Sequence, residues 1–190
     1  MQISIKKAIA EALPVEMRMR VQPLTGFDPS PEILVLLASR DWVLAHSLGN
    51  GLEPDGYVAV SRNHLRTLLT TKHRAFRKRA LQAEGVWTRV LHAPAVDLTS
   101  AATILESLQK LRRFAIVLCE TVDDWHSIHC RIEGIADGQA VLRGFDGAGQ
   151  WERATTRVDV SDITQIRFGS RYLNLYQKYL PKVRPIPGRA

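Results

Sequence analysis

The sequence predicts an α+β protein made of two tandem small antiparallel β-barrels, each followed by a helix and joined by a central helix. The first reason is that the apolar runs are short and turn residues recur about every 8 to 12 residues, which favours strongly bent sheets or barrels. The second is an internal repeat in the order of elements. Asp41-Trp42 corresponds to Asp124-Trp125, and residues 58–61 correspond to residues 158–161.

The first copy is expected to contain four strands and a helix. Continuous or alternating apolar residues predict strands at 33–39, 42–48, 56–60 and about 64–69. Pro54-Asp55-Gly56 is typical of a turn between two of them. A helix over about 71–84 follows, and we expect Gly85 to end it, because glycine readily adopts the left-handed conformation common after helices.

The second copy begins with the central helix, over about 100–112, for which Asp97-Leu-Thr-Ser100 supplies cap candidates. One apolar stripe runs along this helix, formed by Ile104, Leu105, Leu108 and Leu111. Apolar runs then predict strands near 114–121, 126–135, 139–145, 151–160 and 164–168. Ser170 can cap a last helix that reaches about Leu180, where Pro181 ends it because proline cannot continue the hydrogen-bond ladder.

The order of these elements predicts that the chain is divided into three parts. Residues 1–92 form the first small barrel, with an N-terminal segment and a basic helix. Residues 93–180 form the central helix, the second barrel and the C-terminal helix, and residues 181–190 form a flexible basic tail. With 190 residues, of which 45% are hydrophobic, the chain has enough apolar material for a sizeable core.

Composition excludes several classes of protein. No apolar run reaches the roughly 18 to 20 residues that a membrane-spanning helix needs. Residues 1–13 lack the apolar stretch of a secretion signal, and two cysteines, Cys119 and Cys130, are too few for a disulfide framework. We therefore expect a cytoplasmic protein of bacterial type with reduced thiols and no membrane partner.

Residues 128–168 carry features of a known family. They are an early strand with a glycine, Cys130-Arg-Ile-Glu-Gly134, a hairpin with Phe145-Asp146, and a turn in Val158-Asp-Val-Ser-Asp162-Ile163 followed by Ile166-Arg-Phe168. Here the second copy resembles bacterial Sm-like small-barrel domains, and the repeat makes the first copy an unequal tandem partner. Such domains commonly bind RNA and often form rings, so the resemblance implies a nucleic-acid partner and a homo-oligomer. No motif here carries over the family's uridine-binding residues.

Positive charge is concentrated in two segments. The net charge is +7, and residues 62–92 sum to +7 (8 basic, 1 acidic) while residues 157–190 sum to +5 (7 basic, 2 acidic). The densest run holds seven cations and no acid: Arg62, Arg66, Lys72, Arg74, Arg77, Lys78 and Arg79. We call these seven residues the basic run.

On a helix, three members of the basic run fall within about 100° of one another and form one stripe: Arg74, Arg77 and Lys78. The opposite side is expected to pack on the barrel: Phe76, Ala80 and Ala83. Such a stripe suits a nucleic-acid backbone, because each neutralised phosphate releases a counterion.

Several interpretations of the basic run stay open. It is a solvated helix face, a surface for RNA or DNA, or a surface for an acidic protein or anionic lipid. The leading hypothesis is a non-catalytic binding protein that contacts the RNA or DNA backbone through the basic run. The alternative is a protein–protein adaptor or oligomeric scaffold that uses barrel edges or the central helix without nucleic acid.

The aromatic residues favour structural roles. The last helix carries a tyrosine stripe that we expect to be its buried face, with base stacking as the alternative: Tyr172, Tyr176 and Tyr179. Trp42 and Trp125 occupy equivalent positions in the two copies, and we expect both to anchor packing.

Few features of the sequence indicate metal binding or catalysis. His126-Ser-Ile-His129-Cys130 is too short a strand segment to supply three tetrahedral ligands, so we expect no metal site. No phosphate loop, nucleophile elbow or dinucleotide fingerprint appears. We therefore expect no catalytic residue, no cofactor and no enzyme activity.

Overall fold

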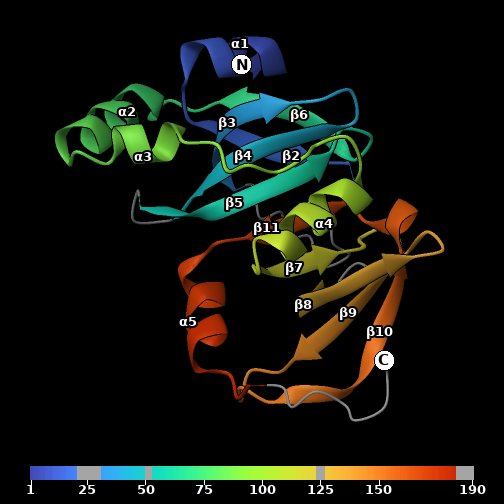
Figure 1. Ribbon diagram of the computed structural model, residues 1–190. Coiled ribbons are helices and arrows are strands. Elements are labelled where there is room, and N and C mark those ends of the chain that lie inside the picture. The colour runs from blue at the N-terminus through green and yellow to red at the C-terminus, as the bar shows by residue number, and fades with distance from the viewer. Residues whose placement is uncertain (21–30, 50–52, 123–126, 183–190) are drawn as a thin grey trace.

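The computed structural model describes residues 1–20, 31–49, 53–122 and 127–182, and every structural statement below refers to these residues. Their strands form one open antiparallel sheet of eleven strands, in the order β1-β6-β2-β3-β4-β5-β11-β7-β8-β9-β10. The expectation of two separate small barrels is therefore wrong. Figure 1 shows the first half of the chain above the second, with β5 and β11 where the two halves meet.

Each half of the chain contributes a consecutive block of this sheet. The first half supplies β1 (Gln2–Ile3), β2 (Val15–Met19), β3 (Glu32–Ala38), β4 (Trp42–Leu48), β5 (Pro54–Ser61) and β6 (Leu65–Thr70). The second half supplies β7 (Phe114–Leu118), β8 (Ser127–Ala136), β9 (Gln139–Phe145), β10 (Trp151–Asp159) and β11 (Gln165–Phe168). The last strand of each half pairs with an early one, β6 with β2 and β11 with β7.

The pairing of β5 with β11, which we call the seam, explains why the first half does not close into a barrel. Closure needs β5 to pair with the strand at the other edge of its block, which is β1 because β6 lies between β1 and β2. The free edge of β5 is instead taken by β11, with Tyr57 opposite Phe168 and Val60 opposite Gln165. A strand edge presents unpaired N–H and C=O groups that any suitably placed strand can satisfy. β11 also pairs with β7 on its other side, so it is an interior strand of the combined sheet.

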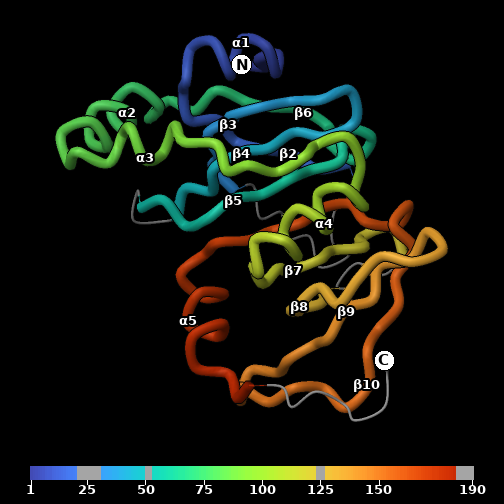
Figure 2. The backbone as a smooth tube through the Cα atoms, viewed as in Figure 1, coloured from blue at the N-terminus to red at the C-terminus, as the bar shows by residue number. Residues whose placement is uncertain are grey.

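Five α-helices flank the sheet: α1 (Ile5–Glu11), α2 (Arg74–Ala83), α3 (Trp87–Leu91), α4 (Ala101–Lys110) and α5 (Arg171–Tyr179). Figure 2 shows α1, α2 and α3 beside the upper half and α5 beside the lower half, with α4 between them. A 3₁₀ turn, Val160–Asp162, joins β10 to β11. The predicted caps are confirmed: Ser100 accepts from the N–H of Thr103, and Ser170 from the N–H of Leu173.

The main core lies under α4 and draws on both halves of the chain. Its residues include Trp42 and Ala59 from the first half and Leu142 and Ile166 from the second. A second core fills the other face of the first half, where Val58 and Val60 join residues of β2, β3, β4 and β6. β5 is therefore buried on both faces, since successive side chains of a strand point to opposite sides.

Some local expectations differ from the structure. Pro54-Asp55-Gly56 is the start of β5 and not a turn. Leu111 lies past the end of α4 and is 45% exposed, so it leaves the predicted apolar stripe. The tyrosine stripe of α5 is buried only in part, because Tyr176 packs with the buried Leu173 but Tyr172 and Tyr179 are 38% and 70% exposed.

The remaining packing predictions have mixed outcomes. Trp42 is buried in the main core, which confirms it as a packing anchor. Trp125 and His126 lie outside the described residues, as does most of the tail, residues 183–190. Four elements were not predicted from the sequence: β1, α1, β2 and α3.

Candidate functional site

The basic run lies on β6, on α2 and on the segments that precede each of them. Four of its members are exposed: Arg62, Arg66, Lys72 and Arg79. Arg77 and Lys78 instead contact the rest of the protein. Arg77 forms an ion pair with Glu32 of β3. The Nζ of Lys78 donates to the carbonyl of Glu11 at 3.2 Å and lies 5.3 Å from the ring centroid of Trp87.

The predicted orientation of α2 is wrong, because Leu81 and not Phe76 anchors the helix. Leu81 is 2% exposed and packs with Leu34, Leu36, Leu48 and Val90, whereas Phe76 is 59% exposed. At 100° per residue, the cations three, four and seven positions before Leu81 lie within about 60° of it. The stripe of Arg74, Arg77 and Lys78 therefore faces toward the sheet.

The opposite side of α2 carries a different set of residues. Phe76 and Arg79 are three positions apart in the helix, and Lys72 precedes Phe76 by four. The helical spacing places Phe76 and Arg79 near one another on the surface of α2, and Lys72 lies just before the helix begins at Arg74. An exposed aromatic ring accompanied by exposed cations is an arrangement used in single-strand nucleic-acid binding. We call Lys72, Phe76 and Arg79, taken together with the exposed Arg66 of β6, the α2 surface.

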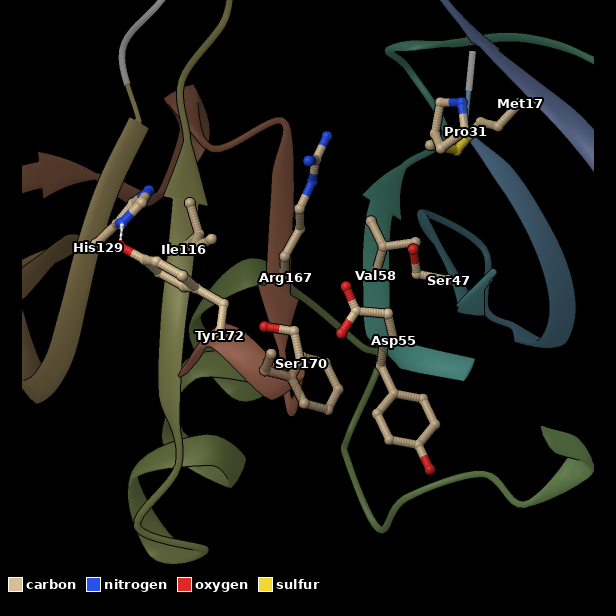
Figure 3. Close-up of a pocket in the computed structure, with 12 residues that line it drawn as sticks. Met17, Pro31, Ser47, Asp55, Val58, Ile116, His129, Arg167, Ser170 and Tyr172 are labelled. Carbon is tan, nitrogen blue, oxygen red and sulfur yellow. Dashed lines mark hydrogen bonds between the residues drawn. The ribbon is translucent and has the colours of Figure 1, made fainter. Parts of the chain in front are cut away.

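A pocket of about 280 Å³ lies at the seam, and sequence reasoning did not anticipate it. One row of side chains crosses the sheet here, since Arg167 of β11 lies opposite Val58 of β5 and Ile116 of β7, and Ile116 lies opposite His129 of β8. All four line the pocket, and Figure 3 shows the guanidinium of Arg167 extending between Ile116 and Val58. We call this cavity the seam pocket.

Arg167 is half-buried and is linked to a polar network on the same strand. Its Nη2 donates to Oε1 of Gln165 at 3.3 Å. The Nε2 of Gln165 donates to both carboxylate oxygens of Glu120, and the hydroxyl of Thr164 donates to Oε2 of Glu120 at 2.7 Å. Burial lowers the pKa of Arg167 and the Glu120 carboxylate opposes this shift. The guanidinium nevertheless stays protonated at neutral pH.

Hydrogen-bonding groups also line the seam pocket. His129 Nδ1 lies 2.9 Å from the hydroxyl of Tyr172, and burial lowers the pKa of this histidine, so its neutral form prevails at neutral pH. The Asp55 carboxylate accepts from the backbone N–H of Arg171 at 3.0 Å. Ser170 also lines the pocket, and Figure 3 labels it below Arg167.

The seam pocket was missed because its key residue looks like a surface residue in the sequence. Arg167 stands between Ile166 and Phe168, so alternation along a strand points it away from the main core and toward solvent. Only the pairing of β11 with β5 brings Val58 and the second core beside it. The sequence nevertheless contained one indication of a polar site. Gln165 and Arg167 are two positions apart, so both polar side chains lie on the same face of the strand.

Comparison with known proteins finds no match to a family model, to a curated protein or to a solved structure. Within the described ranges, no three His, Cys, Asp or Glu side chains gather closely enough to hold a metal ion. No helix in the same ranges has the length and apolar character needed to cross a membrane.

Proposed function

We propose that this protein is a non-catalytic binding protein that contacts the backbone of RNA or DNA through the α2 surface. The observation that carries the proposal is a stretch of exposed cations without acidic neighbours in sequence. In the described part of the chain, Arg77 is the one member of the basic run with a carboxylate partner. Arg66, Lys72 and Arg79 are therefore free to neutralise phosphates.

The orientation of α2 changes which residues we assign to the interface. Arg77 and Lys78 hold α2 against β3 and α1 and are structural. Arg62 is partly engaged, because its Nη1 donates to the carbonyls of Ser39 and Arg40. Phe76 adds a ring on which an unpaired base can stack, so the proposal favours single strands over duplexes.

The resemblance of residues 128–168 to Sm-like domains supports an RNA partner, as many members of that family bind RNA. We place the protein in the cytoplasm, where the thiols of Cys119 and Cys130, both free and buried, stay reduced. A homo-oligomer is compatible with this assignment.

An adaptor role is the second candidate, and the exposed ring of Phe76 is the observation that favours it. The two edges of the sheet favour it less. β1 is only two residues long, and β10 carries a register shift between Trp151 and Thr155 and exposed arginines at 153 and 157. Short, bulged and charged edges resist the addition of a further strand.

The test is fluorescence anisotropy with labelled single-stranded RNA and duplex DNA between about 50 and 200 mM salt. Three phosphate contacts on a single strand give a slope of about −2 and weaken binding about 20-fold over this range. We expect Arg66→Glu/Lys72→Glu/Arg79→Glu to abolish both affinity and slope. The matched control, Lys6→Glu/Arg153→Glu/Arg157→Glu, removes the same charge from exposed positions elsewhere and should bind nearly as the wild type does.

Two results contradict the proposal. Wild-type protein that fails to bind either nucleic acid at about 50 mM salt has no backbone-binding surface of this kind. Equal losses in the two triple variants indicate attraction by net charge and not by the α2 surface. In either case, self-association or partner capture that survives the charge reversals favours the adaptor.

A further inference from the structure

The seam pocket has the composition of a small-molecule site, and its function is separate from nucleic-acid binding. We propose that it binds a small organic carboxylate with an apolar body, and that the guanidinium of Arg167 is the anchor for the carboxylate. Three features support this assignment: a cation with unused donors, apolar walls on both sides of it, and a cavity of about 280 Å³.

The guanidinium of Arg167 has more donors than the described residues use. It carries five N–H groups, and the one acceptor found for them is Oε1 of Gln165. The nearest acid in the network, Glu120, is itself occupied by Thr164 and Gln165. None of the described carboxylates lies within ion-pair distance of Arg167. Burial removes part of the hydration of the Arg167 guanidinium. A bound anion that replaces this water stabilises the charge.

The walls beside Arg167 are apolar. Val58 and Ile116 flank it in register on the two neighbouring strands, and Met17 and Phe168 also line the cavity. Figure 3 shows the guanidinium pointing away from Asp55, whose carboxylate accepts from the N–H of Arg171. The two side chains form no ion pair, so this acid does not compete for Arg167.

These features favour a carboxylate over a phosphate. A planar guanidinium offers two parallel N–H groups that match the two oxygens of one carboxylate. A phosphate dianion would place a second charge among Val58, Ile116 and Met17, where the described residues offer no second cation. The cavity is at the small end of the range for ligand pockets, which suits a compound with a single ring.

Benzoate is the probe for the test, with benzamide as its neutral analogue and inorganic phosphate as a third arm. We would follow the side-chain Nε–H signal of Arg167 and the methyl signals of Val58 and Ile116 by NMR. A ligand of this size is expected to bind with millimolar affinity. The proposal predicts saturable shifts of all three signals with benzoate, and at least about tenfold weaker binding of benzamide and phosphate.

The variant Arg167→Gln removes the charge and keeps a polar side chain, and it should weaken benzoate binding at least about tenfold. Arg157→Gln on β10 is the matched control and should leave the affinity unchanged. The comparison of benzoate with benzamide needs only wild-type protein. It therefore tests whether binding requires the negative charge of the ligand even where Arg167→Gln does not fold. Three results overturn the proposal: no shift with benzoate, equal binding of benzamide or phosphate, or full benzoate binding by folded Arg167→Gln.

Discussion

The substitution Gly56→Ala tests the seam, the feature that most separates this fold from two independent barrels. Gly56 has a φ of +77°, and a Cβ at this position would lie 2.5 Å from the carbonyl oxygen of Phe168 and 2.7 Å from the carbonyl carbon of Gly169. Those atoms belong to the end of β11 and the residue after it. The steric conflict exists only because β5 and β11 are neighbours.

The expected loss of stability has two sources. The left-handed conformation costs alanine about 1 to 2 kcal/mol relative to glycine. Forcing the backbone of β11 away from the new methyl group adds about 1 to 3 kcal/mol. Gly138 is the matched control, because its φ is +75° but no atom lies within 4 Å of the place that an alanine methyl group would occupy there. Gly138→Ala therefore isolates the conformational cost.

Urea unfolding and thermal melting, followed by tryptophan fluorescence, measure both losses. For a chain of this length, each kcal/mol lowers Tm by roughly 2 to 4 °C. We expect Gly56→Ala to lower the free energy of unfolding by about 1 to 3 kcal/mol more than Gly138→Ala does. Equal losses in the two variants would refute the close approach of β5 to β11.

Three further predictions follow from the core and its buried titratable groups. Leu108→Ala empties a fully buried site under α4 and should cost about 2 to 5 kcal/mol by urea unfolding, whereas Leu111→Ala should cost far less. Burial lowers the pKa of His46 in the folded protein. Below about pH 6.5, His46 is therefore protonated in the unfolded chain while it stays neutral in the folded protein. Stability should fall as pH drops below that value, by at most about 1.4 kcal/mol per pH unit, and His46→Gln should flatten the curve. Burial raises the pKa of Cys119 to about 11, and that of Cys130 further, so iodoacetamide at about pH 8 should label them only after unfolding in urea.

Local signals predicted the elements of this fold well where a short segment decides the outcome. The strands at 42–48 and 139–145 coincide with β4 and β9, because each is an apolar or alternating run bounded by turn residues. Ser100 and Ser170 mark two helix starts through a cap that involves only three further residues. The 3₁₀ turn, β1 and α3 are too short to carry a periodic signal.

The arrangement of those elements depends on contacts that no local pattern encodes. The pairing of Val58 with Arg167 joins residues more than a hundred positions apart in the chain. The orientation of α2 was wrong for a related reason. Its cations and Phe76 suggested a polar side and an apolar side, but Leu81 fits a core formed by Leu34 and Val90 and decides which side turns inward.

The seam also links the corrected fold to the proposed carboxylate site. Val58 and Met17 come from the first half of the chain and Arg167 and Ile116 from the second, so the seam pocket exists only while β5 and β11 stay paired. Gly56→Ala strains that pairing, and Gly138→Ala does not. We therefore expect benzoate affinity to fall in Gly56→Ala and to match the wild type in Gly138→Ala, with both measured by NMR titration at a temperature where each variant is folded. If Gly56→Ala is destabilised but binds benzoate with wild-type affinity, the seam pocket does not depend on the seam, and the strain lies elsewhere.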